Sequence, residues 1–268
     1  MTQSREENLV FCVLEKNKNR QLNYRGLQKR VIMEVDVKSV ICIILARGGS
    51  KGLHRKNLQL LDGEPLVSRA IRHALESKVI GTVLVSTDDD EIAKVAREAG
   101  AEVPFLRPAH YSDDLATTES ALQSALADYE SSNNKQFDIC VFITATDIFR
   151  DVSWITQSVN KLFNNPDLDS VFSGHKTHKN FWEQESDGNW VRLRQWMASY
   201  SSRQVRRAII REDTGLACAS RAWLWREGRR IGDKVAIIVN DDDFTGIDIH
   251  GQEDLDLAEA ALKIRRQR

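Results

Sequence analysis

The sequence lacks the features of a membrane protein, an exported protein or a nucleic-acid-binding protein. No apolar run approaches the roughly 18 residues that a membrane-spanning helix needs. Residues 1–36 lack the basic, apolar and small-residue pattern of a signal peptide. The net charge is −1 at pH 7, whereas proteins that bind nucleic acids or membrane surfaces generally carry an excess of basic residues. We therefore expect no membrane partner and no nucleic-acid partner.

Cysteine is scarce as well. The 268 residues include four cysteines, which are widely separated and show no CxxC spacing. This spacing predicts no zinc site, and a reducing cytoplasm is the expected location. Cys42 and Cys140 fall in apolar runs and are predicted to be small core residues.

Two common nucleotide-binding motifs are also absent. The chain contains neither GxGxxG nor GxxxxGK[ST], so neither a Rossmann dinucleotide site nor a Walker P-loop is predicted. Residues 39–45 instead form an apolar run, which at this length favours a buried parallel strand over a helix. The glycine-rich turn GGSKG follows at residues 48–52. Such a turn lets backbone N–H groups approach a phosphate, because no side chain blocks the way.

Positive charge is concentrated at this turn. Four cations lie within ten residues: Arg47, Lys51, Arg55 and Lys56. Cations and accessible N–H groups in one place predict a site for a polyanion such as a nucleoside triphosphate. The alternative is a basic, glycine-rich surface loop without a ligand.

The order of the other segments predicts an α/β fold. Periodicity predicts helices at 65–78, 88–100, 119–129, 151–164 and 253–264, and strands at 82–87, 102–106, 138–143, 170–173 and 234–239. Because strands and helices alternate, we expect an open, mostly parallel twisted sheet with helices on both faces. Ligands in such sheets bind beyond the carboxyl ends of the strands, where residues 47–56 and 144–150 both fall. The acidic triplet at 88–90 is predicted to cap a helix rather than bind a metal.

The domain organisation is predicted to be simple. We expect residues 1–36 to be a dispensable N-terminal extension and residues 37–268 to form a single domain. Residues 175–230 are rich in Trp and Arg and have weak periodicity. We expect this segment to leave the main sheet as an insertion that lines part of the substrate site and contacts a second subunit. The alternative is an amphipathic surface segment.

Five segments resemble, in order, the motifs of the CMP-sugar synthetases, in particular the acylneuraminate (CMP-N-acetylneuraminate) cytidylyltransferases. They are ARGGSKG at 46–52, KNL at 56–58, VSTDDDEIAKVAREAGAEV at 85–103, LRPAHYSDDLATT at 106–118 and GIDIHGQEDLDLAEAAL at 246–262. The resemblance extends over about residues 37–264 and implies a Rossmann-like nucleotidyltransferase fold. The family is commonly dimeric, so we expect a homodimer.

The resemblance also implies a reaction, in which CTP and a free 2-keto-3-deoxy sugar acid give a CMP-sugar and pyrophosphate. It implies catalytic roles for Arg47, Lys56 and Asp248, with Lys56 stabilising charge at the α-phosphate. The implied nucleotide-binding residues are Ala46, Arg47, Gly48, Gly49, Ser50, Lys51, Lys56, Asn57, Asp114 and Thr117. Three alternatives stay open: an activator of an eight-carbon, Kdo-type acid, an enzyme for a sugar 1-phosphate, and a non-catalytic nucleotide-binding homologue.

The metal site is where the chain departs from the family pattern. The family's terminal motif is Asp–apolar–Asp beside Mg²⁺, whereas the chain has Asp248-Ile249-His250. Imidazole is a poor ligand for Mg²⁺, which prefers hard oxygen donors. The chain also places Asp147 where the family usually has serine. We expect Asp147 and Asp248 to bind the same Mg²⁺ ion. His250 is expected not to bind the ion directly but to lie behind these carboxylates or to act through a water molecule. The alternative is that Asp147 caps the helix that starts near Val152.

The sugar-binding residues are implied less firmly. Thr144, Thr146 and Arg150 match the family's strand-end motif, and Arg211 matches an arginine that suits a sugar carboxylate. The alternative for Arg211 is a surface salt bridge. The predicted substrate is a sialic-acid-like nonulosonic acid, with legionaminic and pseudaminic types included.

Overall fold

The computed structural model describes residues 35–112, 116–199, 202 and 204–267. The chain divides into residues 1–33 and residues 34–268, and all described residues belong to the second unit. Nearly all of the expected N-terminal extension lies outside the described residues, so its dispensability stays a prediction. No helix in the described part of the chain is both long enough and apolar enough to cross a membrane.

The second unit is built on a seven-stranded sheet with the order β11-β6-β10-β5-β1-β4, and β9 pairs with β6. The strands are β1 (Val40–Leu45), β4 (Thr82–Ser86), β5 (Ile139–Phe142), β6 (Ser170–Thr177), β9 (Ile209–Glu212), β10 (Cys218–Arg221) and β11 (Val235–Asn240). Five strands run in one direction, whereas β9 and β10 run antiparallel to their neighbours. Ile43 of β1 lies opposite Leu84 of the edge strand β4 and Phe142 of β5.

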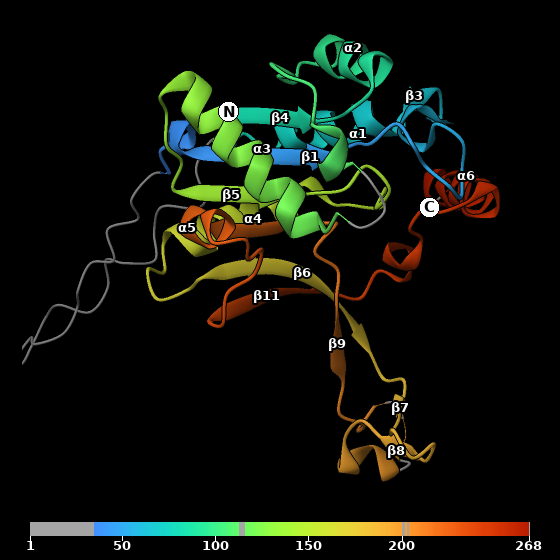
Figure 1. The fold of residues 1–268 in the computed structure, drawn as a ribbon. Helices are drawn as coiled ribbons and strands as arrows, with labels where there is room; N and C mark the ends of the chain where they lie inside the picture. The colour runs from blue at the N-terminus through green and yellow to red at the C-terminus, as the bar shows by residue number, and fades with distance from the viewer. Residues whose placement is uncertain (1–34, 113–115, 200–201, 203, 268) are drawn as a thin grey trace, which may run out of the picture. The chain divides into compact units, whose positions relative to one another are not determined.

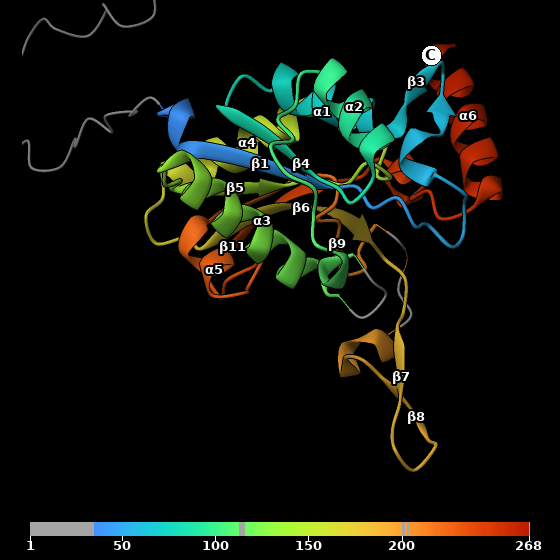
Figure 2. The same cartoon turned by 45° about the horizontal axis from the view of Figure 1, so that its top comes forward.

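Helices cover both faces of this sheet (Figures 1 and 2). They are α1 (Leu66–Glu76), α2 (Asp90–Glu98), α3 (Thr118–Asn133), α4 (Val152–Phe163), α5 (Ala222–Arg226) and α6 (Gln252–Arg266). Successive side chains of a strand point to opposite faces. Val40, Cys42 and Ile44 accordingly join a core with α1, α2, α4 and α6, whereas Ile41 and Ile43 join a second core with α3 and α5. The predicted fold class is therefore confirmed.

Short elements complete the chain. The hairpins are β2 (Leu60–Leu61) with β3 (Glu64–Pro65) and β7 (Trp182–Gln184) with β8 (Trp190–Arg192). The 3-10 turns are η1 (Val37–Ser39), η2 (Lys56–Leu58), η3 (Ala109–Tyr111), η4 (Gln195–Ala198) and η5 (Asp243–Gly246). Gly188, at φ +88°, makes the turn between β7 and β8.

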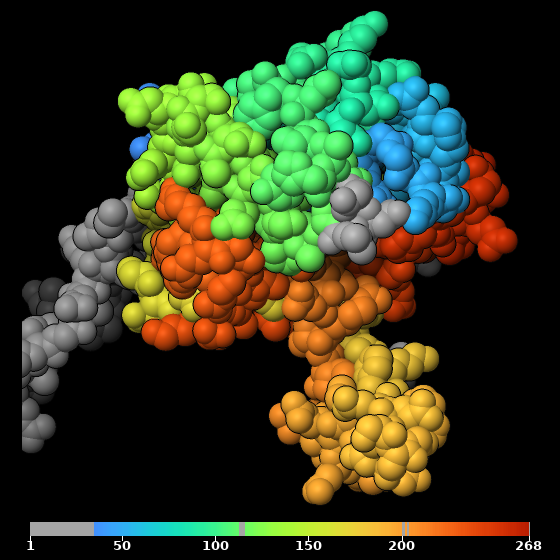
Figure 3. Space-filling view, in the orientation of Figure 1, coloured from blue at the N-terminus to red at the C-terminus, as the bar shows by residue number. Residues whose placement is uncertain are grey.

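Two expectations about the sheet were wrong. Residues 102–106 form no strand, and only Glu102 bridges to Leu84. The segment 175–230 does not leave the sheet as a whole, because β6 extends to Thr177 and both β9 and β10 return to it. Within the described residues, β7 and β8 pair only with each other. Their hairpin stands clear of the seven-stranded sheet in Figures 1 and 2 and belongs to the lobe that projects from the body in Figure 3. The four-residue β10, CASR, has no apolar alternation to reveal it in the sequence.

The acidic triplet caps α2, as predicted. Asp89 is the N-cap, and its Oδ1 accepts hydrogen bonds from the N–H groups of Glu91 and Ile92, both at 2.9 Å. Arg55 donates to both carboxylate oxygens of Asp89, at 2.9 and 3.0 Å. One carboxylate therefore starts the helix and also holds the segment that follows the glycine-rich turn.

We predict that Asp89→Ala lowers the free energy of unfolding by about 1–2 kcal/mol, because the N-cap and the Arg55 ion pair are lost together. Urea unfolding measures this change. Asp90→Ala is the control, since Asp90 is exposed and is not the cap. Equal stability of the two variants would contradict the prediction.

Candidate active site

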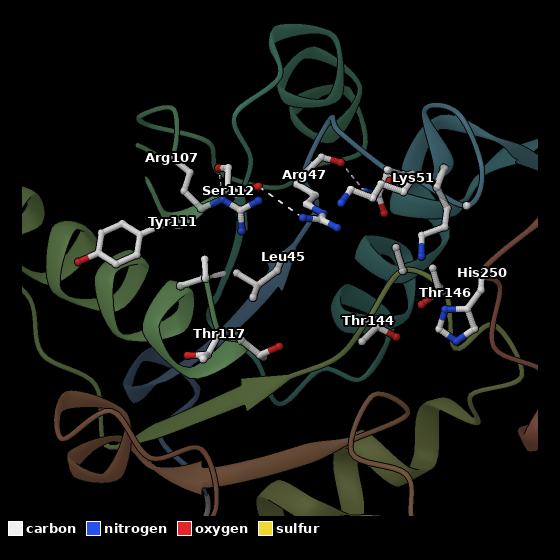
Figure 4. Close-up of a pocket in the computed structure, with 18 of the residues that line it drawn as sticks. Leu45, Arg47, Lys51, Arg107, Tyr111, Ser112, Thr117, Thr144, Thr146 and His250 are labelled. Atoms are coloured by element: carbon white, nitrogen blue, oxygen red, sulfur yellow. Dashed lines mark hydrogen bonds between the residues drawn. The ribbon is translucent and has the colours of Figure 1, made fainter. Parts of the chain in front are cut away.

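A cavity of about 540 Å³ opens at the carboxyl ends of β1 and β5 (Figure 4). Nine of the residues predicted from the sequence line it together: Arg47, Ser50, Lys51, Lys56, Asn57, Thr117, Thr144, Thr146 and His250. They come from the turn after β1, the start of α3, the loop after β5 and the segment before α6. Residues far apart in the sequence therefore meet where the parallel strands end.

Contacts from three directions hold the turn after β1. The N–H of Gly48 donates to Asp88 Oδ1 at 2.9 Å. The buried Asn57 donates its amide N–H to the carbonyl of Arg47 at 3.0 Å. Gly52 lies against the segment before α6, because a Cβ on it would be 2.4 Å from the carbonyl oxygen of His250. The backbone of the turn is thus fixed before any ligand binds.

Four cations line the cavity, namely Arg47, Lys51, Lys56 and Arg107. Burial lowers the pKa of Lys56, and the nearby charge of Asp248 opposes this shift. Arg107 is buried, and its Nε donates to Ser112 Oγ at 3.0 Å. Figure 4 shows Arg107, Ser112 and Arg47 on the same side of the cavity. This concentration of positive charge can neutralise a polyanion.

Two carboxylates lie close to Lys56. Burial raises the pKa of Asp147, and the charge of Asp248 raises it further. Asp147 Oδ2 accepts a hydrogen bond of 2.6 Å from the hydroxyl of Thr144. The N–H of Ile249 donates to the carbonyl of Thr146 at 3.3 Å, so the two segments that carry the aspartates run side by side. The hydrogen bond from Thr144 and the charge of Arg150 oppose the rise in the pKa of Asp147.

Asp248 has one satisfied oxygen and one unsatisfied oxygen. Its Oδ2 lies 2.9 Å from His250 Nε2. Its Oδ1 is buried and accepts no hydrogen bond from the described residues. Within the same part of the chain, no group of three or more His, Cys, Asp or Glu side chains is arranged to hold a metal.

Comparison with known proteins identifies the family of this site. The model of the cytidylyltransferase family matches residues 41–231, which include β1, the glycine-rich turn, β5 and β10. The chain belongs to the cytidylyltransferase family. The family expected from the sequence motifs is thus confirmed.

Two curated cytidylyltransferases and one solved structure illustrate the relationship. The chain is 38% identical over 126 residues to a pseudaminic acid cytidylyltransferase of Campylobacter jejuni subsp. jejuni serotype O:2, covering 47% of this chain and 53% of the relative. It is 34% identical over 151 residues to N-acylneuraminate cytidylyltransferase A of Danio rerio, covering 56% and 34%. The chain thus matches about half or less of the length of these relatives.

The solved structure is that of a CMP:2-keto-3-deoxy-manno-octonic acid synthetase in complex with CTP. It matches with a TM-score of 0.61 over 85% of this chain and 99% of that chain. The sequence identity is 12%, so the match supports the fold alone.

Arg150 does not reach the cavity, in contrast to its expected sugar-binding role. It is 6% exposed, and its guanidinium donates to the carbonyls of Thr144, Gly215 and Leu216. Burial lowers its pKa to about 10, so it remains charged at neutral pH. A buried arginine that satisfies three carbonyls holds the loop after β5 to the loop before β10. We therefore correct its role from sugar contact to support of the loop.

Arg211 also lies outside the cavity lining. Its guanidinium donates to both carboxylate oxygens of Asp213, at 2.6 and 2.9 Å. The salt bridge that was the alternative for Arg211 is therefore present, although Asp213 is mostly buried rather than at the surface. A carboxylate clamp by Arg211 stays a prediction, because a substrate would have to compete with Asp213.

Three of the residues predicted to bind the nucleotide do not line the cavity. Ala46 is fully buried in the core, Gly48 is held by Asp88, and Gly49 is exposed with open space around it. Asp114 lies outside the described residues.

The prediction also omitted several cavity residues, of which Arg107, Tyr111, Ser112 and Thr118 contribute polar groups. The motif at 106–118 contains all four, so the signal was present. The family pattern drew attention to its acidic and threonine positions instead.

The close approach at Gly52 yields a prediction. We expect Gly52→Ala to raise the dissociation constant for CTP about tenfold, because the new methyl group pushes the turn away from His250. Isothermal titration calorimetry with CTP measures the effect. Gly49→Ala is the matched control, since it adds the same methyl group into open space. Unchanged affinity in Gly52→Ala, or an equal loss in both variants, would contradict the prediction.

The correction at Arg150 yields another. We expect Arg150→Lys to lower the free energy of unfolding by about 2–4 kcal/mol, because one ammonium group cannot reach three carbonyls. Arg229→Lys, at an exposed ion pair, should change it by less than about 0.5 kcal/mol. If Arg150 instead contacted the sugar acid, Arg150→Lys would keep its stability and raise the KM for that acid.

Proposed function

We propose that the protein transfers a cytidylyl group from CTP to a free nonulosonic acid and releases pyrophosphate. The observation that carries this proposal is the cavity at the ends of β1 and β5, where four cations gather. Asp147 and Asp248 lie next to its lining residues Thr146 and His250, within electrostatic reach of Lys56. Membership of the cytidylyltransferase family supports CTP as the nucleotide.

The lining of the cavity suits the two parts of CTP. Leu45, Ala121 and Phe142 supply apolar surface beside the hydroxyls of Thr117 and Thr118, which fits a base and a ribose. The cations Arg47, Lys51 and Lys56 fit the triphosphate. An apolar part with a few placed polar groups is the usual composition of a small-molecule site.

Mg²⁺ fits the two carboxylates. The unsatisfied buried Oδ1 of Asp248 and the like charge of Asp147 beside it both favour a divalent cation. Mg²⁺ typically binds through one or two carboxylates together with substrate phosphates and water, so two protein carboxylates suffice. We propose that Asp147 and Asp248 hold the ion, which would neutralise phosphate charge, and that His250 orients Asp248.

The reaction needs charge neutralisation and an in-line approach. The anomeric hydroxyl oxygen of the acid forms a bond to the α-phosphorus, and the bond from this phosphorus to the pyrophosphate oxygen breaks. The hydroxyl proton leaves to solvent. Lys56, half-buried beside Asp248, stabilises the charge that develops on the α-phosphoryl oxygens. Arg47 and Lys51 stabilise the pyrophosphate that leaves.

The acid is placed beside Thr144 and Thr146, whose segment lines the cavity next to the aspartates. Similarity to enzymes named for pseudaminic acid and for N-acylneuraminate supports a nonulosonic acid as the class.

We also propose a cytoplasmic homodimer. Trp182 and Trp190, on the hairpin that stands clear of the sheet, are about half exposed or more, which suits contact with a second copy. Cys42, Cys140 and Cys218 are free and buried, as expected in a reducing compartment.

Pyrophosphate release tests the proposal. With CTP and Mg²⁺, we expect release with at least one acid from a panel of sialic, legionaminic and pseudaminic acids, and not with a Kdo-type acid or a sugar 1-phosphate. Lys56→Met should lower kcat at least about 100-fold, because it removes the charge at the α-phosphate.

The negative results are informative as well. Release with the Kdo-type acid alone would contradict the proposed substrate class. CTP binding without release for any acid would indicate a non-catalytic homologue. His250→Asp would then show whether the altered metal motif is the cause.

A further inference from the structure

Helix α6 is fastened at both ends to the segment that carries Asp248. At its start, Asp254 Oδ2 accepts the N–H groups of His250 and Gly251, both at 2.9 Å. Near its end, Arg265 pairs with Asp242, which in turn accepts the N–H of Phe244 at 3.0 Å as the cap of η5. Contacts from both ends of α6 thus hold residues 242–251, the segment that precedes this helix, in a closed loop.

Arg265 also reaches the segment that carries Asp147. Its guanidinium lies over the ring of Phe149, at 4.7 Å from the centroid, and over that of Phe244, at 5.1 Å. The two rings are stacked, with centroids 5.4 Å apart. Phe149 is two residues after Asp147 and is buried, whereas Phe244 is four residues before Asp248. One side chain therefore contacts both acid-bearing segments.

This arrangement opposes a repulsion built into the site. Asp147 and Asp248 carry like charges on adjacent segments. A backbone hydrogen bond from Ile249 to Thr146 joins these segments directly. Without a metal, repulsion favours separation of the two segments. Stacked aromatic rings and a cation over both of them provide attraction that does not depend on the metal.

We propose that Arg265 is a positioning residue that holds the loops of Asp147 and Asp248 together, through Phe149, Phe244 and Asp242, so that the metal site is formed before the metal binds. This inference rests on the metal role given to the two aspartates under Proposed function. When the metal ligands are already held in place, less free energy is lost in ordering them as the metal binds. Loss of the contact should therefore weaken metal affinity more than it lowers turnover at saturating metal.

Direct metal binding tests this proposal. We would titrate Mn²⁺ into the full-length protein and follow free Mn²⁺ by electron paramagnetic resonance, with CTP absent. In Arg265→Gln we expect the dissociation constant for Mn²⁺ to rise about three- to tenfold, the change that one partly exposed ion pair and cation–π contact can supply. At saturating Mg²⁺, kcat should stay within about twofold of the wild type.

Arg266→Gln is the matched control. Arg266 is the next residue on α6 and pairs with Asp62, beside the β2–β3 hairpin and away from both acid-bearing loops. Its substitution should leave Mn²⁺ affinity unchanged. Asp242→Asn keeps an acceptor for the η5 cap and the guanidinium over both rings but removes the ion pair, so it should raise the dissociation constant for Mn²⁺ by no more than Arg265→Gln does. The double variant should bind Mn²⁺ no more weakly than Arg265→Gln. If Arg265→Gln fails to fold, Asp242→Asn alone provides the test.

The outcomes separate this inference from the proposed function. Wild-type Mn²⁺ affinity in Arg265→Gln, equal losses in the Arg265 and Arg266 variants, or a fall in kcat without a change in affinity would each overturn the positioning role. Absence of Mn²⁺ binding by the wild-type protein, or unchanged binding in Asp248→Asn, would overturn the metal assignment itself and the inference with it.

Discussion

Burial of β1 and β5 on both faces of the sheet constrains where this protein can bind a ligand. The two strands are adjacent and parallel, and their side chains are shared between the cores on either face. Because neither strand has a solvated face, polar groups can gather only where the strands end. The turn at 47–56 and the loop at 144–150 are the two chain segments that leave these ends, and both line the cavity.

The cavity depends on a balance between opposed charges. Burial and the charge of Arg47 lower the pKa of Lys56 and of Arg107, whereas burial and the charge of Asp248 raise the pKa of Asp147. The ligand that we propose, a nucleoside triphosphate with its divalent metal, would balance both sets of charges. The protein reduces the cost of holding these groups in place through neutral or paired contacts behind them, such as those of Asn57, Arg150 and Arg265.

The sequence allowed the fold class and about half of the cavity residues to be predicted, because these depend on local patterns. The buried run at 39–45 and the glycine-rich turn lie next to each other in the sequence, and Asp89 caps a helix that starts beside it. What could not be predicted depends on partners far away in the chain. In the sequence Arg150 resembles a ligand-binding arginine, because two of its three carbonyl acceptors, those of Gly215 and Leu216, lie far away in the chain. Strand β10 is held by its neighbours β5 and β6 rather than by its own composition.

Anomalous diffraction from crystals grown with CTP and Mn²⁺ tests the central claim most directly, since it locates both the metal and the nucleotide. We predict a single strong Mn²⁺ peak between the carboxylates of Asp147 and Asp248, with the triphosphate lying along residues 47–56. A metal peak away from these aspartates, or CTP bound outside the cavity at the ends of β1 and β5, would contradict the account.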